Sequence, residues 1–156
     1  MRQIELVTRL PASAAEAWAV LIDVDRWPEW GRLVTSARGE FVPGRVWTMR
    51  LSGRDGGPPR FMHPRFVAMP RPRGLVFETR FGGAWGVRLV HAFDVECDGP
   101  DRSLLRQSFD ATGALVPLLW ESLHRGMTQF EALGVDLARR LGQPDERGHT
   151  GAGPRG

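Results

Sequence analysis

Residues 116–141 read VPLLWESLHRGMTQFEALGVDLARRL, and this stretch decides the fold. Its apolar positions recur mostly three or four residues apart, which is the spacing of one face of an α-helix. They are Val116, Leu119, Trp120, Leu123, Met127, Phe130, Leu133, Leu137 and Leu141. Gly142 and Pro144 then provide a stop signal. The pattern predicts one amphipathic helix about 39 Å long, at about 1.5 Å per residue, which is long enough to cross a whole sheet.

The segment before this helix has the pattern of a series of strands. Strand-like runs occupy 34–41, 45–52, 60–69, 74–81, 85–97 and 103–112. Turn signals rich in glycine and proline separate them, such as Pro43-Gly44, GRDGGPP, PRPRG and DGPD. Because parallel neighbours need a long crossover, these short connections predict antiparallel pairing.

The N-terminal segment predicts a strand followed by two short helices. Apolar and polar side chains alternate over residues 2–10, and Pro11 ends this run. Ser13 and Glu16 have the spacing of a capping box ahead of an apolar helical pattern. A second helical turn is expected in DVDRWPEWGRL, where Pro28 suits the start of a turn.

Length and composition indicate one globular domain. The chain has 156 residues, and we expect residues 1–142 to form the domain and the glycine-rich, charged residues 143–156 to be a disordered tail. No apolar run suits a membrane span or a signal peptide, so a cytoplasmic location without membrane insertion is expected. Cys97 is the only cysteine, which excludes an internal disulfide. The basic residues are all arginines, interleaved with acids, and they suggest neither nucleic-acid binding nor Schiff-base chemistry.

Several motifs in order resemble the polyketide cyclase and dehydrase branch of the SRPBCC superfamily, also called START-like or Bet v 1-like. They are LPASAAEAWAVLIDVDRWPEW, SARGEFVPGRVWTMRL, RFVAMPRPRGLVFE, HAFDVE and SFDATGALVPLL, and they span residues 4 to about 140. The resemblance implies an α+β helix-grip fold. In that fold a curved antiparallel sheet of about seven strands wraps around the long C-terminal helix, with two short helices after the first strand. It also implies an internal cavity for a small apolar molecule. Members of the superfamily include cyclases, aromatases, lipid carriers, receptors and chaperone activators, so the fold does not name a reaction.

Strand alternation predicts which side chains face the cavity, because successive residues of a strand point to opposite faces. The expected ligand-binding residues lie on the apolar rows of the strands and on the long helix. They are Trp47, Met49, Phe77, Trp85, Leu89, Phe93, Phe109, Trp120, Leu123 and Met127.

Four polar residues are candidates for catalysis. His91 and Gln107 lie on otherwise apolar rows. The run at 60–69 is ambiguous, and we expect the set that holds His63 and Arg65 to face inward. His91 is either a hydrogen-bonded core residue or a partner for a bound carbonyl or phenol, and Arg65 would favour an enolate or carboxylate.

These residues are compatible with two functions. The first is a cyclase or aromatase-like enzyme of secondary metabolism, with no metal or nucleotide cofactor. The second is a non-catalytic carrier, sensor or sequestering protein for an apolar natural product. The expected partner in both is a small apolar ligand, and the expected assembly is a monomer or weak homodimer. The four histidines lack metal-ligand spacing, so no metal site is expected.

Overall fold

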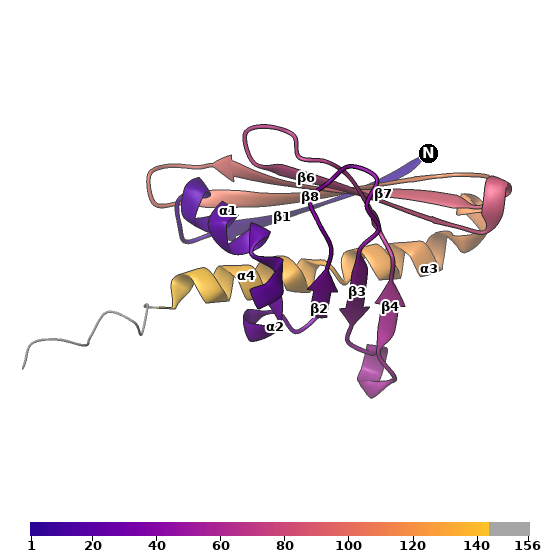
Figure 1. The fold of residues 1–156 in the computed structure, drawn as a ribbon, viewed down its shortest axis with the longest axis horizontal. Helices are drawn as coiled ribbons and strands as arrows, with labels where there is room; N and C mark the ends of the chain where they lie inside the picture. Colours follow the sequence, from indigo (N-terminus) through magenta and orange to yellow (C-terminus); the bar gives the residue numbers. More distant parts are fainter. Residues whose placement is uncertain (144–156) are drawn as a thin grey trace, which may run out of the picture.

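The computed structural model describes residues 1–143, which form an α+β fold of two antiparallel sheets and a C-terminal helical layer (Figure 1). The strands are β1 (Arg2–Leu10), β2 (Val34–Arg38), β3 (Thr48–Leu51), β4 (Arg60–Met62), β5 (Arg65–Ala68), β6 (Gly74–Phe81), β7 (Val87–Cys97) and β8 (Ser103–Thr112). The α-helices are α1 (Ala14–Ile22), α2 (Trp27–Trp30), α3 (Val116–Thr128) and α4 (Glu131–Gly142). Short 3-10 turns are η1 (Val24–Arg26), η2 (Arg54–Gly56) and η3 (Gly83–Trp85).

The strands form one long sheet and one short sheet. The five-stranded sheet has the order β1-β8-β7-β6-β5, and the three-stranded sheet has the order β2-β3-β4. Every pairing is antiparallel, as the short connections predicted. An isolated bridge between Val46 and Arg65 links the two sheets. In Figure 1 α3 and α4 run together along one face of the five-stranded sheet, while β2, β3 and β4 descend beside them.

The predicted strand at 60–69 is two strands in different sheets. His63 and Pro64 separate β4 from β5, and Pro64 has no N–H to contribute to a strand ladder. Its carbonyl instead accepts a 2.7 Å hydrogen bond from the backbone N–H of Trp47. This division raises the number of strands from the expected seven or so to eight.

The short N-terminal helices form where the sequence predicted them. The Ser13 hydroxyl accepts from the Glu16 N–H at 3.2 Å, and the Glu16 carboxylate accepts from the Ser13 N–H at 3.0 Å, which completes the capping box. Trp27 is buried, and its indole N–H donates to the carbonyl of Leu21 at 2.9 Å. The second of these contacts joins α2 to the end of α1.

The C-terminal helix follows the predicted course but is interrupted at Gln129 and Phe130. The Thr128 hydroxyl donates to the His124 carbonyl four residues earlier, a bond that bends helices. Backbone hydrogen bonds between residues three apart, rather than four, then connect α3 to α4. One of them runs from the Phe130 N–H to the Met127 carbonyl at 3.1 Å. In this connection the Phe130 carbonyl accepts from the Leu133 N–H at 3.1 Å.

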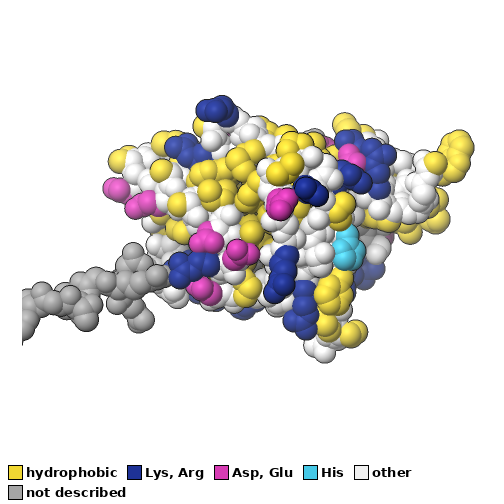
Figure 2. Space-filling view, viewed as in Figure 1, with side chains coloured by type: hydrophobic (Ala, Val, Ile, Leu, Met, Phe, Trp, Pro, Cys, Tyr) yellow, Lys and Arg dark blue, Asp and Glu magenta, His cyan; other side chains and the backbone are white. Residues whose placement is uncertain are grey.

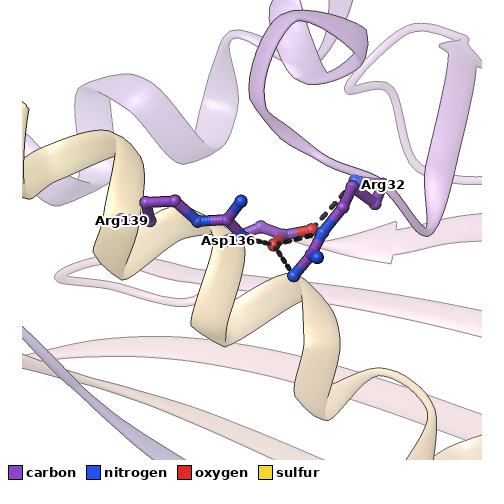
Figure 3. A network of polar contacts seen from close by, with 3 residues as sticks. All are labelled: Arg32, Asp136 and Arg139. Carbon is purple, nitrogen blue, oxygen red and sulfur yellow. Dashed lines mark hydrogen bonds and ion pairs between the residues drawn. The ribbon is translucent and has the colours of Figure 1, made fainter.

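A buried carboxylate anchors α4 to the segment after α2 (Figure 3). The side chain of Asp136 is 0% exposed, and it accepts from the Arg32 backbone N–H at 2.9 Å and from the Arg32 guanidinium at 2.8 and 3.0 Å. Arg139, one turn along α4, also pairs with it. Burial raises the pKa of Asp136, but the hydrogen bonds and charge of Arg32 outweigh that effect, so the pKa lies below its ordinary value.

Two further features concern the surface. On the face shown in Figure 2, basic and acidic side chains are interspersed with apolar ones and form no continuous basic stripe. Within residues 1–143, no helix is long and apolar enough to cross a membrane. The tail expected to be disordered lies, apart from Gln143, outside the described residues.

Candidate ligand cavity

A cavity of about 270 Å³ lies between the sheets and α3. Its lining comes from β3, η2, β4, β6, β7, β8, α3 and the helix interruption. The lining residues are Met49, Leu51, Arg54, Arg60, Met62, Pro64, Phe77, Thr79, Phe81, Leu89, His91, Phe109, Ser122, Leu123, Gly126, Met127, Gln129 and Phe130. Arg54, Phe81 and Ser122 are exposed and mark the mouth, whereas Phe109, Met127 and Phe130 are buried and form the inner end. Ligand pockets commonly measure about 300–1,000 Å³, so this cavity suits a compact molecule.

His91 is the polar group at the inner end. Its ring stacks on Phe109, with centroids 3.9 Å apart and planes 22° apart. Phe93 lies 4.0 Å away on a tilted plane, and Phe130 meets the ring edge to face at 4.9 Å. Three aromatic rings therefore hold the imidazole in one orientation while it lines the cavity.

Gln107 determines which nitrogen of His91 carries the proton. The buried Gln107 side chain donates from Nε2 to the carbonyl of Phe130 at 3.0 Å, and a carbonyl can only accept. Its Oε1 therefore points to His91 Nε2, 3.2 Å away, and must accept a hydrogen bond from it. This assignment places the proton of neutral His91 on Nε2 and leaves Nδ1 with a free lone pair. No hydrogen bond to Nδ1 is found within the described residues.

The surroundings keep His91 neutral. Burial among aromatic rings lowers its pKa from the ordinary 6.5 to about 3, although the hydrogen bond to Gln107 raises it in part. At neutral pH the imidazole is therefore an acceptor at Nδ1 and a donor at Nε2, and the donor is already used by Gln107.

The structure places the ten predicted ligand-binding residues in three groups. Six of them line the cavity, namely Met49, Phe77, Leu89, Phe109, Leu123 and Met127. Trp47 and Phe93 are buried in the core outside the lining, and Trp47 packs edge to face on Phe77 with centroids 5.4 Å apart. The other two, Trp85 and Trp120, lie outside the cavity.

The expectation that Trp85 faces the cavity is wrong. The chain turns in η3 before β7 begins at Val87, so the alternation of that strand does not extend to Trp85. Its side chain is 80% exposed at the tip of the β6–β7 connection. Trp120 is half-buried on α3, where the Arg2 guanidinium lies 4.7 Å over its ring.

The inward orientation expected for His63 and Arg65 is also wrong. Both side chains are exposed, and an Arg65 Nη1 donates to the Gly44 carbonyl at 3.0 Å. The alternate set faces inward, because Phe66 is 1% exposed and packs against Phe77 with centroids 5.6 Å apart. Of the four predicted polar residues, only His91 lines the cavity, and Gln107 is hydrogen-bonded to it from outside the lining.

Sequence reasoning missed the polar residues near the mouth. Arg54 lies in a glycine- and proline-rich turn and Gln129 at the helix interruption, so strand alternation places neither residue. Arg60 and Met62 line the cavity from β4. Met62 and Phe66 belong to the alternate set of the 60–69 run, so choosing that set would have placed both inward.

An open groove and the distribution of metal-ligand side chains were the other candidate sites. A groove of about 610 Å³ between Arg32 and Val135 is open to solvent and has no enclosed apolar interior. Among residues 1–143, no three His, Cys, Asp or Glu side chains are grouped to hold a metal ion.

Comparison with known proteins assigns a family to this fold. Residues 1–141 match the family described as polyketide cyclase / dehydrase and lipid transport. The chain belongs to this family. The match confirms the resemblance found in the sequence motifs. No curated protein sequence matches the chain.

Solved structures share the fold of this polyketide cyclase / dehydrase family member at low identity. A START superfamily protein from Mycobacterium smegmatis is 17% identical with a TM-score of 0.65, covering 89% of this chain and 96% of that one. Truncated norcoclaurine synthase from Thalictrum flavum is 15% identical with a TM-score of 0.70, covering 92% and 95%. The di-domain ARO/CYC BexL from the BE-7585A biosynthetic pathway is 15% identical with a TM-score of 0.70. This chain is covered to 90% but spans only 47% of that di-domain protein. At these identities the likeness establishes the helix-grip fold.

Proposed function

We propose that the protein binds a compact, apolar, polyketide-like or aromatic molecule in the cavity, with a hydroxyl of the ligand donating to His91 Nδ1. The observation that carries this proposal is an oriented acceptor, His91 Nδ1, at the apolar inner end of the chamber. His91 is fixed by Gln107 and by stacked aromatic rings, and its free nitrogen has no partner within residues 1–143. An apolar pocket with few placed polar groups is the usual form of a small-molecule site.

Affinity and orientation would come from different parts of the cavity. Burial of apolar ligand surface contributes about 25 cal/mol per Å², and Leu123, Met127 and Phe109 provide the surface for it. A hydrogen bond to His91 then selects a ligand with a hydroxyl at the inner end. A ligand lacking that hydroxyl leaves Nδ1 unpaired in an apolar site, which costs binding energy.

The properties of His91 favour binding over proton transfer. A general base works best when its pKa is near the operating pH, whereas the pKa of His91 is about 3. The expected catalytic partners His63 and Arg65 lie outside the cavity. Non-catalytic carriage, sensing or sequestration of the ligand is therefore the primary proposal.

Cyclisation is the second candidate, and family membership supports it. A cavity can accelerate ring closure by holding a flexible chain with its reacting carbons close together, without a titrating side chain. Incubation with a short linear poly-β-ketone tests this alternative. Faster formation of one cyclic product, lost when the cavity is blocked, would establish it, and product formation equal to that in buffer would exclude it for that substrate.

Blocking the cavity tests the binding proposal. Leu123→Trp would place a bulky ring in the cavity, whereas Leu118→Trp changes a residue on the same helix that is 80% exposed and outside the lining. We expect 2-naphthol to bind the wild type and Leu118→Trp equally in calorimetric titrations, and Leu123→Trp to lose binding at least tenfold. Equal binding by both variants would place the ligand outside the cavity.

A further inference from the structure

Two arginines lie near the mouth of the cavity on the β3–β4 connection. Arg54 belongs to η2 and is exposed, while Arg60 begins β4 and is half-buried. Both line the cavity. The Arg54 guanidinium reaches α3, since its Nη2 lies 3.5 Å from the position that a Cβ on Gly126 would take.

Arg60 has hydrogen-bond donors without acceptors. Its Nη2 donates to Gln129 Oε1 at 2.7 Å and weakly to the Ser52 carbonyl at 3.4 Å. Its Nε is buried and has no partner, and no hydrogen bond from Nη1 is found within residues 1–143. A guanidinium carries five N–H groups in a planar fork, and leaving buried donors unpaired is unfavourable. The contacts of Arg60 therefore leave Nη1 for a ligand acceptor, whereas Nε is enclosed by the protein.

The positive charge of the pair is not neutralised by the part of the chain that the structure describes. The cavity lining contains no Asp or Glu, and no carboxylate in residues 1–143 lies within 4.0 Å of either guanidinium. Burial, followed by the charge of Arg54, lowers the pKa of Arg60. By contrast, Arg32 and Arg106 pair with acids. Arg54 and Arg60 thus form a site that favours a negative charge supplied from outside.

We propose that Arg54 and Arg60 bind the carboxylate of an apolar ligand, so that the cavity selects amphipathic organic acids over neutral molecules of the same shape. The inference rests on the proposed function, because the apolar body of the ligand occupies the same chamber. The planar donor fork of arginine matches a carboxylate better than a lysine ammonium does. The carboxylate lies near the mouth, and the apolar body extends toward the Phe109 end.

The test compares two ligands that differ only in charge. Calorimetric titrations use 2-naphthoate and its neutral counterpart 2-naphthamide at pH 7 with the full chain. We expect the wild type to bind naphthoate roughly tenfold more tightly than naphthamide, since hydrogen bonds to charged groups are the stronger ones. The preference should shrink as salt concentration rises, because the arginines lie near the mouth.

Substitutions then assign the preference to the two arginines. Arg60→Gln and Arg54→Gln should each weaken naphthoate binding several-fold, and the double variant should abolish the preference while naphthamide binding changes less than twofold. Arg60→Lys should keep part of the preference, which also covers the case in which Arg60→Gln does not fold. Arg50→Gln is the matched control, because Arg50 is exposed on β3 and outside the lining.

The outcomes separate this proposal from the binding function itself. Equal affinity of the wild type for the two ligands would overturn the carboxylate site and leave the apolar binding function standing. A preference that survives in the double variant, or falls equally in Arg50→Gln, would also overturn it. Failure of both ligands to bind would overturn the binding function and the carboxylate site together.

Discussion

Gln107 holds His91 with its proton on Nε2, because the Gln107 amide nitrogen is occupied by the Phe130 carbonyl and only its oxygen faces the imidazole, 3.2 Å away. The same carbonyl also accepts from the Leu133 N–H at 3.1 Å, where the C-terminal helix is interrupted. The amide orientation and the free nitrogen in the cavity are therefore linked features of one arrangement.

Nitrogen NMR of the histidine ring tests this tautomer directly. In protein labelled at histidine, we expect His91 Nδ1 to give the signal of an unprotonated nitrogen and Nε2 that of a protonated one at pH 7. Assignment follows from the signals missing in His91→Phe. Gln107→Leu should release the constraint and mix the two tautomers. Protonation at Nδ1 in the wild type would contradict the arrangement.

Acid stability should show the lowered pKa of His91. The folded protein keeps His91 neutral down to about pH 3. The unfolded chain takes up a proton near pH 6.5, so this residue destabilises the fold as the pH falls from about 6.5 toward 3. Its contribution to the free energy of unfolding falls by up to about 1.4 kcal/mol per pH unit.

Denaturant unfolding between pH 4 and 7 measures that slope. His91→Phe should have a shallower pH dependence than the wild type, although its stability at pH 7 also changes because Gln107 loses a partner. His63→Phe, at an exposed position, should keep the wild-type slope. Parallel curves for the wild type and His91→Phe would show that burial does not disfavour the charged imidazole.

The Arg32–Asp136 pair should contribute to stability at neutral pH. Asp136→Ala removes the buried acceptor of the Arg32 backbone N–H and guanidinium, and we expect a loss of about 2 kcal/mol. Glu121→Ala, on the exposed surface of α3, should stay within about 0.5 kcal/mol. Because the pKa of Asp136 is lowered by folding, its charge-dependent contribution is full above its unfolded pKa of about 3.9 and is lost as the pH falls through the folded value. The stability difference between Asp136→Ala and the wild type, measured by thermal unfolding, should therefore be smaller at pH 3 than at pH 7.

Gly134 sets the distance between α4 and β1. A Cβ on Gly134 would lie 2.2 Å from the hydroxyl oxygen of Thr8 and 3.0 Å from the Cβ of Thr8. The substitution Gly134→Ala therefore pushes α4 away from β1. We expect a loss of about 1–3 kcal/mol, despite the better helix propensity of alanine. Thr8→Gly in the same chain should recover most of the loss by removing the contacted side chain. Additive effects of the two substitutions in denaturant unfolding would show that this contact does not limit the packing.

Local rules predicted most of the fold. The apolar spacing of residues 116–141, the Ser13–Glu16 capping box and the turn signals all describe neighbours in sequence, and the structure confirms them. The helix interruption was not predicted, because the apolar spacing continues through it at Met127, Phe130 and Leu133. The hydrogen bond from Gln107 to the Phe130 carbonyl joins residues distant in sequence, so no local rule could place it. The separation of β4 from β5 had a local signal in Pro64, which the alternation of the flanking residues obscured.

The candidate site was predictable only where strands are regular. His91 and Gln107 lie on neighbouring strands whose alternation continues unbroken, so their inward position could be inferred. Trp85 lies in a turn, where alternation no longer reports orientation. Arg65 lies on a run whose two alternating sets are both partly apolar, so alternation did not decide which set faces inward. Arg54 and Arg60 flank a turn that no periodic pattern places, so their position at the cavity required the three-dimensional structure.

The structure of a complex with 2-naphthol tests the central claim most directly. The account predicts the naphthalene ring in the cavity beside Phe109 and Met127, with its oxygen about 2.7–3.0 Å from His91 Nδ1. A naphthol bound in the open groove near Arg32 and Val135, with the chamber around His91 closed or filled by protein side chains, would contradict it.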